Sequence, residues 1–409
     1  MTETPKPSSD RIEALDVIRG IALCGLIPVN ILDFAFVEDH FFSPRHVDPS
    51  QHWLWYLVSI FAIGKFVSLF SLLFGAGILL ATEKADSRDL PVTARYLRRL
   101  GLLLGMGLLH AYLIWHGDIL VPYAIIGFVL FWTRRWPARV HALIGAILLM
   151  VLPAGLVLLG LVFRWAGFDI GEWIENAQDD PGTDWMIDSY RNGWFQQIPA
   201  RFVVAVMVQI IGFPIFFPLC GGMMLLGMAA YKTGFLQRTW TRPRYGIIAM
   251  VTLLIGVTLG TASHLISFNR DWNVNSLLTT APLGSLATIL LATGYASAVL
   301  FWSFRHQHRF LWHPLRALGR MALTNYLSQS LILGFIFYGH GLNRYTELEF
   351  ATVMAIVPAV WVFQAVFSVL WLRHFAFGPA EWAWRCLTYG KRFPLRRPAA
   401  RPDSGRSRP

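Results

Sequence analysis

Ten apolar runs, most of them long enough to cross a lipid bilayer, constrain this chain more than any other feature of its sequence. A transmembrane helix needs about 20 predominantly apolar residues, because the hydrocarbon core offers the backbone no partner outside the span. The chain is 55% hydrophobic and only 14% charged, which excludes a disordered protein and a soluble enzyme. We therefore predict an all-α, polytopic integral membrane protein with about ten transmembrane helices. The candidate spans lie near residues 15–37, 54–82, 97–115, 118–132, 141–163, 202–230, 245–267, 281–302, 320–338 and 350–372.

The Lys and Arg residues predict the orientation of these spans. If the N-terminus is cytoplasmic, 27 of the 35 basic residues fall in cytoplasmic tails and connections, and only four fall in outer connections. Cytoplasmic connections are the ones enriched in Lys and Arg, so both termini are predicted to be cytoplasmic. The net charge of +11 then follows from topology, and no nucleic-acid partner is expected.

The chain divides into one large membrane domain and a short cytoplasmic end. Residues 1–372 form the predicted transmembrane domain, and their largest outer connection, 165–199, is a candidate lid. Residues 373–395 are aromatic and basic, as in segments that lie on the inner leaflet. Residues 396–409 are rich in Pro, Arg and Ser and are predicted to be a disordered basic tail. The lipid bilayer is the expected partner, and the sequence is compatible with a homo-oligomer.

The first span carries polar residues on one face. Asp16, Arg19, Asn30 and Asp33 fall within a sector of about 100° on a helical wheel. A charge within the membrane costs about 2.5–3.5 kcal/mol on insertion scales, so these residues need partners or a wet cavity. Asp16 and Arg19 are predicted to pair. The pair either fixes helix packing or forms the charged inner mouth of a site.

His110 and Asp118 are the strongest candidates for chemistry. His110 lies near the outer end of the third span, and Asp118 follows a short turn at the start of the fourth. A carboxylate that orients an imidazole where water is restricted is what a general base requires. The alternative is a histidine satisfied by a backbone carbonyl. On the same span, Gly101 and Gly105 predict a close helix contact.

Further polar residues lie within or beside other spans. Lys65 is predicted either to bind an anionic group or to balance an acidic residue of the first span. Asn325 and Gln329 belong to a polar stripe in the ninth span, with Arg320 at its cytoplasmic end. Interhelical hydrogen bonds explain this stripe most simply, and a ligand cavity is the sharper alternative.

The outer connection 38–52 contains three evenly spaced histidines, His40, His46 and His52. Nothing in their surroundings fixes a coordination geometry, so they are expected to be solvated, and no metal site is predicted. His40 is nevertheless a second candidate base, because it follows Asn30 closely.

Six blocks of sequence are spread in order over nearly the whole chain. They are LDVIRGIALCGLIPVN (15–30), KFVSLFSLLFGAG (65–77), HAYLIWHGDILVPYAIIG (110–127), MLLGMAAYKTGFL (224–236), GRMALTNYLSQSLI (319–332) and GPAEWAWRCLTYG (378–390). Together these blocks resemble the YeiB-like family of bacterial inner-membrane proteins, and the resemblance implies a bacterial inner membrane for this chain.

The first span is also similar to that of a wider transmembrane acyltransferase superfamily, which includes heparan-α-glucosaminide N-acetyltransferase. An Asp-x-x-Arg-Gly start precedes an Asn there, as Asp16, Arg19, Gly20 and Asn30 do here. A catalytic His follows that Asn, and its nearest equivalent is His40, although the residues around it differ. His110 and Asp118 match the signature His and Asp of the YeiB-like pattern.

The resemblance implies an acyltransferase that moves an acyl group from cytoplasmic acyl-CoA, most simply acetyl-CoA, to an outer acceptor. Arg19, Lys65 or Arg320 would attract the donor phosphates. His110, oriented by Asp118, would act as the base, and Asn30 would donate to the oxyanion. A permease for a small organic anion and a non-catalytic membrane protein on the same scaffold are the alternatives.

Overall fold

The computed structural model describes residues 9–37, 43–86, 92–167, 182–270, 272, 274–305 and 309–397. These segments are almost entirely helical, and the predicted all-α class is confirmed. The elements are α1 (Ser9–Ala35), η1 (Pro49–Gln51), α2 (His52–Phe61), α3 (Lys65–Asp86), α4 (Val92–Leu113), α5 (Leu120–Phe131), α6 (Ala138–Trp165), α8 (Gly182–Arg191), α9 (Ile198–Lys232), α10 (Arg242–Phe268), α11 (Val274–Trp302), α12 (Arg309–Arg320), α13 (Ala322–Phe337), α14 (Phe350–His374) and α15 (Pro379–Tyr389).

Seven stretches among the described residues are long and apolar enough to cross a membrane. Their outward faces are also apolar. Leu158 of α6, Ile210 of α9 and Leu254 of α10, for example, are each more than half exposed. A soluble protein rarely exposes such a surface, so this is a multi-pass membrane protein. The seven stretches are Glu13–Ala35, Pro49–Glu83, Ala138–Trp165, Ile198–Lys232, Arg242–Phe268, Leu278–Trp302 and Phe350–His374.

Three more helices occupy the other candidate spans but are less suited to crossing on their own. The helices α5 and α13 are apolar but short, with 12 and 16 residues. The first half of α4 carries the cations Arg95, Arg98 and Arg99. The helix α13 packs on α1, whereas α4 and α5 pack on each other and on α3 and α9. All three therefore have helical neighbours within the bundle.

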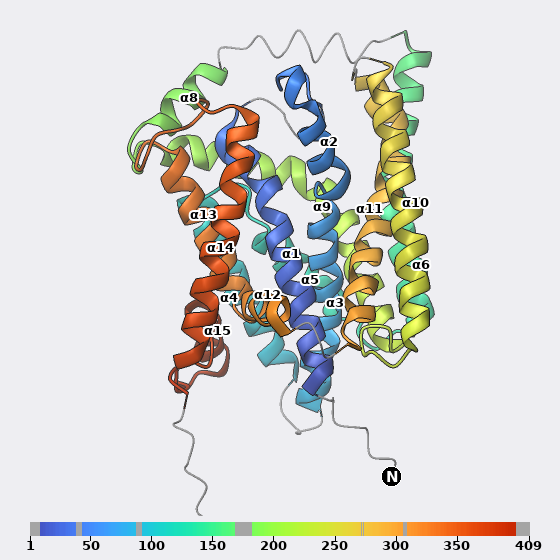
Figure 1. Ribbon diagram of the computed structural model, residues 1–409, viewed down its shortest axis with the longest axis vertical. Helices are drawn as coiled ribbons and strands as arrows, with labels where there is room; N and C mark the ends of the chain where they lie inside the picture. Colours follow the sequence, from blue (N-terminus) through green and yellow to red (C-terminus); the bar gives the residue numbers. More distant parts are fainter. Residues whose placement is uncertain are drawn as a thin grey trace, which may run out of the picture.

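The long helices stand side by side in one bundle, and both described ends of the chain lie at the same end of it (Figure 1). The start of α1 and the terminal helix α15 mark this lower end, whereas α8 lies at the upper end. The short helix α12 lies across the lower part of the bundle and appears nearly end-on in Figure 1. It joins α11 to α13 and packs on α1.

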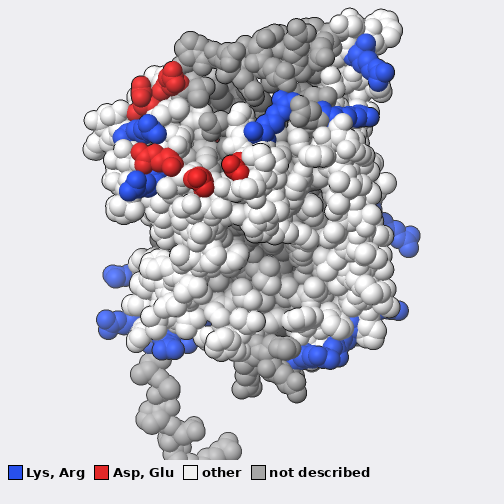
Figure 2. Space-filling view, turned by 45° about the horizontal axis from the view of Figure 1, so that its top comes forward, with Lys and Arg blue, Asp and Glu red and all other residues white. Residues whose placement is uncertain are grey.

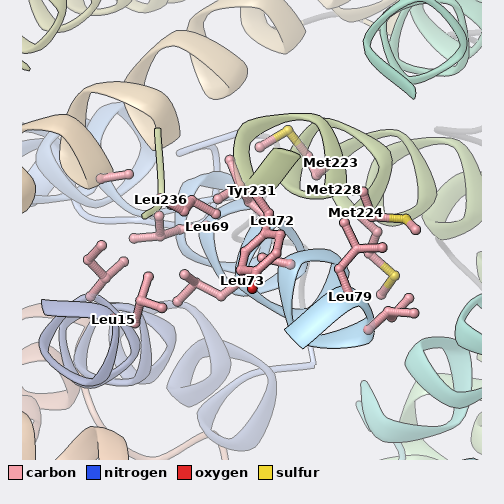
Figure 3. Packing of buried hydrophobic residues seen from close by; sticks show 14 of the residues in the cluster. Leu15, Leu69, Leu72, Leu73, Leu79, Met223, Met224, Met228, Tyr231 and Leu236 are labelled. Carbon is pink, nitrogen blue, oxygen red and sulfur yellow. The ribbon is translucent and has the colours of Figure 1, made fainter. Parts of the chain in front are cut away.

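Leu and Met side chains of α1, α3 and α9 form the main buried cluster (Figure 3). Two glycines let α3 and α9 approach closely. A Cβ at Gly75 would lie 1.9 Å from the carbonyl oxygen of Met224, and one at Gly227 would lie 1.9 Å from that of Leu72. Small residues at a helix crossing allow the backbones to approach closely. The resulting van der Waals packing holds helices together in lipid, where the hydrophobic effect does not.

The expected helix contact at Gly101 and Gly105 is wrong. Nothing lies within 4 Å of a Cβ built at either position, so both glycines face open space. The close contact of α4 is at Gly107, where a Cβ would lie 2.7 Å from the amide nitrogen of Val121. The spacing of Gly101 and Gly105 correctly indicated that α4 has small residues for a close contact. The glycine that faces α5 is Gly107 and not either of these two.

Acidic side chains gather at the upper end of the bundle in the face shown in Figure 2. Basic side chains lie near both ends of this face, and along its lower rim they are not accompanied by acids. This agrees in direction with the charge asymmetry of the sequence.

The described parts of the predicted lid and tail pack on the bundle. Of the connection 165–199, the described part includes α8, whose Tyr190 is 1% exposed. Near the C-terminus, the Ala376 amide donates to the carbonyl of Leu395, and the Arg397 amide donates to that of His374. Residues 395–397 therefore lie beside the end of α14.

Candidate functional site

His110 and Asp118 meet where α4 ends and α5 begins. His110 lies in the last turn of α4, and Asp118 lies two residues before α5. The backbone contact at Gly107 brings the two helices together at this level. Asp118 Oδ2 accepts from the amide of Val121 at 2.7 Å, which satisfies one of the first amides of α5, groups that have no acceptor within the helix.

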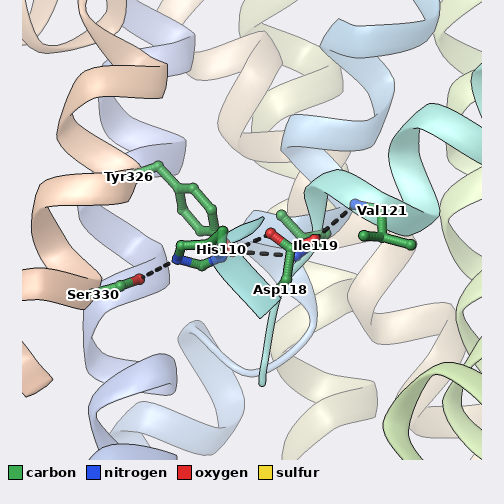
Figure 4. Close-up of polar contacts among 6 residues, drawn as sticks. All are labelled: His110, Asp118, Ile119, Val121, Tyr326 and Ser330. Atoms are coloured by element: carbon green, nitrogen blue, oxygen red, sulfur yellow. Dashed lines mark hydrogen bonds and ion pairs between the residues drawn. The ribbon is translucent and has the colours of Figure 1, made fainter. Parts of the chain in front are cut away.

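The imidazole of His110 lies between two oxygen atoms (Figure 4). Its Nδ1 is 2.8 Å from Asp118 Oδ1, and its Nε2 is 2.9 Å from Ser330 Oγ on α13. The side chains of His110 and Asp118 are each 1% exposed. The predicted pairing of His110 with a carboxylate is confirmed, and the alternative of a histidine satisfied by a backbone carbonyl is wrong.

The carboxylate fixes the tautomer of the neutral imidazole. An ionised carboxylate only accepts hydrogen bonds, so Nδ1 must carry the proton that Asp118 accepts. Nε2 is then the free base, and it accepts from the hydroxyl of Ser330. This nitrogen is the atom that can take a proton in a reaction.

Tyr326 connects this group to a cavity. Its ring centroid lies 5.2 Å from that of His110, and its hydroxyl accepts from the amide of Ile119 at 3.1 Å. Tyr326 and Ser330 are four residues apart on α13, so they share one face of that helix.

The cavity has a volume of about 310 Å³ and a gradient of polarity along its length. Its lower mouth is charged, and its wall is made of Phe and Leu side chains. The order of residues within each helix gives the direction: Arg19 precedes Leu26 on α1, and Arg99 precedes Leu103 on α4. The inner end is formed by Tyr123, Ile119 and Tyr326. The cavity thus runs from cations at the lower end toward His110.

Three arginines line the mouth. Arg19 pairs with Asp16 at 2.7 Å, as the sequence predicted. The guanidinium of Arg99 lies 4.1 Å from the centroid of the Trp384 ring on α15, and Arg320 donates to the carbonyl of Ala376. Both arginines retain further donors that can bind an anion.

Arg320 also lines a second cavity, of about 350 Å³, at the lower end of the bundle. That cavity is strongly basic, because Arg373 from the end of α14 and Arg397 from the C-terminal segment face it together with α12. Because Arg320 lines both cavities, a ligand with its phosphates in the second cavity and an apolar chain in the first would lie against Arg320.

Glu381 of α15 borders the first cavity and holds the beginning of α13. Its carboxylate accepts from the amides of Leu323 and Thr324 and from the hydroxyl of Thr324. Burial raises the pKa of Glu381, and these hydrogen bonds oppose the rise. The contact fixes the position of α13, which carries Tyr326 and Ser330.

A second carboxylate–histidine pair lies beyond the first, toward the upper end. His116 Nε2 is 3.0 Å from Asp33 Oδ2, and His116 Nδ1 is 3.0 Å from the hydroxyl of Tyr190 on α8. Trp115 lies between the two groups. Its indole nitrogen donates to Asp33 at 2.6 Å, and its ring centroid is 6.2 Å from that of His110.

The remaining predicted residues lie away from the cavity wall. Lys65 is buried and donates to the carbonyl of Ser59 at 2.7 Å. Asn30 is half-buried on α1, one turn before Asp33, and is not among the described residues that line the cavity. Asn325 bonds to Ser368, and Gln329 bonds to Gln364. Interhelical bonding between α13 and α14 therefore accounts for both, and His40 lies outside the described residues.

Sequence reasoning missed Ser330, Tyr326, Arg99 and Glu381. Ser330 lies in an apolar helix one position beyond the polar stripe, which turns it about 100° away from Gln329. A lone Ser on another face was the available signal. The sequence indicates Arg99 only as one of the basic residues that predict topology, and no pattern in it indicates that Arg99 lines a cavity.

Comparisons with known proteins confirm the resemblance to the YeiB-like family. The family described as "Protein of unknown function (DUF418)" matches residues 230–391. Uncharacterized protein YeiB of Escherichia coli (strain K12) is 32% identical over 93% of this chain and 96% of its own length. Uncharacterized protein YxaH of Bacillus subtilis (strain 168) is 31% identical over 94% of this chain and 96% of its own length. No solved structure matches the chain.

Proposed function

The chain belongs to the YeiB family, and from this premise we propose that it is a membrane-embedded acyltransferase. It takes an acyl group from cytoplasmic acyl-CoA and transfers it to a hydroxyl or amine on the outer side. The observation that carries the proposal is the continuous arrangement of basic mouth, apolar cavity and buried His–Asp pair.

The donor fits this arrangement by the charge of its phosphates. Its phosphates bind Arg320, Arg99 and Arg19, where guanidinium groups form charge-assisted hydrogen bonds. The basic second cavity extends the phosphate site beyond Arg320. The thin pantetheine arm follows the apolar wall inward, and the thioester stops at Tyr326.

The chemistry falls to His110. Its Nε2 removes a proton from the attacking nucleophile, and Asp118 stabilises the imidazolium that forms. Burial excludes water, which would otherwise hydrolyse the thioester. The outer pair of Asp33 and His116 lies where an acceptor would enter from the opposite side.

The orientation is part of the proposal. Ten helices cross an inner membrane, both termini are cytoplasmic, and the basic lower end faces the cytoplasm. The 27 to 4 distribution of basic residues supports it. Single cysteines at Arg139 and Arg344, in a variant without native cysteines, test it with an impermeant maleimide. Label on intact cells is expected at residue 344 and not at residue 139, and the reverse would invert the topology.

The activity test uses protein reconstituted in vesicles with labelled acetyl-CoA on the side of the lower end. Transfer of label to an added acceptor mixture is expected to fall by about 10²–10⁴-fold in His110→Ala, the usual contribution of general base catalysis. His52→Ala is the control, because His52 bonds the Val47 carbonyl away from the cavity. Transfer unaffected by His110→Ala would remove His110 from the mechanism, and absence of acetyl-CoA binding would overturn the proposal.

A permease for an organic anion is the second candidate. The helices α5 and α13 have only 12 and 16 residues, and α5 begins two residues after Asp118. Short or interrupted helices are common at transporter binding sites. Flux of a labelled organic anion across the same vesicles, without any covalent transfer, would favour this function.

A further inference from the structure

We propose that Ser330 is a nucleophile and that His110 and Asp118 activate it as a Ser–His–Asp triad. Ser330 would carry the acyl group between donor and acceptor as an ester. The proposal rests on acyl transfer for its substrate class, but the triad itself is tested with a reagent that needs no acyl-CoA.

The three side chains have the distances that a triad requires. Ser330 Oγ is 2.9 Å from His110 Nε2, and His110 Nδ1 is 2.8 Å from Asp118 Oδ1. A nucleophile within hydrogen-bond reach of a base, with the base oriented by a third group, is the recognisable pattern. Such triads occur on unrelated folds and in different chain orders, so the order His–Asp–Ser is no obstacle.

The hydrogen-bond partner of His110 Nε2 determines which proton this nitrogen can remove first. Because the proton on Nδ1 is held by Asp118, the free base is the single lone pair of Nε2, and this lone pair accepts the hydrogen bond from Ser330. An acceptor that reacted directly with the donor would first have to displace Ser330. The nearest proton that His110 can remove is therefore that of the Ser330 hydroxyl.

Ser330 differs from several other hydroxyl side chains of the bundle. Ser71, Thr252 and Ser297 each donate to the carbonyl four residues earlier on their own helix. This internal bond is the ordinary way to satisfy a hydroxyl in a membrane helix. Ser330 is only 2% exposed, and its hydroxyl bonds His110, 220 residues away in the chain. Ser59 also bonds a histidine, but the other ring nitrogen of His264 faces the carbonyl of Gly260 and not a carboxylate.

The first half-reaction balances with the donor alone. Ser330 Oγ attacks the thioester carbonyl carbon, and its proton moves to His110 Nε2. The carbon–sulfur bond then breaks, and the leaving thiolate takes the proton from Nε2. The products are O-acyl-Ser330 and the free thiol, and Asp118 stays ionised throughout.

The second half-reaction restores the serine. The acceptor hydroxyl or amine attacks the ester carbon and gives its proton to Nε2. The bond to Ser330 Oγ breaks, and the oxygen recovers the proton. Each half-reaction uses one face of the group: the donor arrives past Tyr326, and the acceptor arrives from the side of Trp115.

Tyr326 is placed to stabilise the oxyanion of both steps. Its hydroxyl accepts from the amide of Ile119, so its own proton is available to a substrate oxygen at the inner end of the cavity. Tyr326 lies one helical turn before Ser330. Hydrogen-bond donors that point at the developing oxyanion contribute strongly to stabilising the transition state of acyl transfer.

A fluorophosphonate probe tests the triad in the intact membrane protein. The activated Ser oxygen displaces fluoride and forms a stable phosphonate ester, which mass spectrometry locates. Label is expected on Ser330 in the wild type, and a loss of at least about 10²-fold in labelling rate is expected in Ser330→Ala and His110→Ala. Ser328→Ala is the matched control, because the Ser328 hydroxyl lies on the same helix, donates to the carbonyl of Asn325 and accepts from Gln364. Gel filtration in detergent checks that each variant is folded.

A second measurement follows the acyl group itself. Protein incubated with labelled acetyl-CoA and then denatured is expected to retain label that hydroxylamine releases, and Ser330→Ala is expected to retain none. Wild-type protein that takes up neither label overturns the proposal, as does probe label that persists in Ser330→Ala. Acyl transfer that survives Ser330→Ala would overturn the serine while leaving the acyltransferase. Probe label on Ser330 without any use of acyl-CoA would keep the triad and overturn the acyl-CoA donor.

Discussion

The carboxylate of Glu381 lies 2.6 Å from the hydroxyl of Thr324, at the first turn of the helix that carries Ser330. The contact is reciprocal, because Thr324 Oγ1 accepts from the amide of Ala380, the residue before Glu381. The C-terminal helix α15 and the site helix α13 therefore satisfy each other's free amides. The position of the site depends in this way on a segment outside the spans.

Glu381 gives the first prediction, a pH dependence of stability. Its pKa is raised above 4.5 in the folded protein by burial, so the folded state binds a proton more readily than the unfolded state. Stability is therefore expected to rise as the pH falls through the folded-state pKa toward 4.5, and to be lowest above that pKa. Thermal unfolding in detergent between pH 5 and pH 8 should show a smaller slope for Glu381→Gln than for the wild type. Equal slopes would contradict the assignment.

Asp118→Asn tests the role of the carboxylate. An amide can donate to Nδ1 and thereby favour the wrong tautomer, which removes the free base at Nε2 while conserving shape. Acyl transfer is expected to fall by about 10³–10⁴-fold, with donor affinity little changed. Single-turnover rates and equilibrium binding of acetyl-CoA separate the two quantities. A large loss of binding with normal turnover would assign Asp118 to the donor site instead.

Arg320→Gln tests the phosphate site. Arg320 lines both lower cavities, and loss of a charge-assisted hydrogen bond costs about 1.5–3 kcal/mol, or roughly 10–150-fold in affinity. The KM for acetyl-CoA is expected to rise by this factor while kcat changes little. Arg139→Gln is the control, because Arg139 is exposed near the same end of the bundle but lines neither cavity. A similar effect in both variants would indicate a general surface charge effect.

Gly77→Leu should block the first cavity without harming the fold. Gly77 lines that cavity, and nothing lies within 4 Å of a Cβ built there, so a larger side chain enters empty space. Removing a helical Gly is also expected to stabilise α3 by up to about 1 kcal/mol. Binding of acetyl-CoA should be lost while the melting temperature stays equal or rises. Gly101→Leu is the matched control, because Gly101 also faces open space but lies outside the cavity.

The sequence could predict the pairs of residues that are close in the chain, but not the contact between residues that are far apart in it. The pairing of Asp16 with Arg19 and of His110 with Asp118 followed from short separations, three and eight residues, across a helix turn or a tight loop. Ser330 is 220 residues from His110, and its approach depends on how α13 is rotated by its bonds to α14. No local pattern encodes that rotation. The sequence predicts that Lys65 binds an anionic group or balances an acidic residue of the first span. Its ammonium instead donates to the nearby carbonyl of Ser59, a partner that the pattern of charges does not indicate.

Trp115 has a consequence for the passage of protons across the bundle. Its ring contacts the His110 group on one face, and its indole nitrogen bonds Asp33 of the upper group. In the proposed orientation, one aromatic side chain separates the ionisable group that faces the donor from the ionisable group that faces the acceptor. A proton that crossed the bundle at this level would therefore have to pass Trp115.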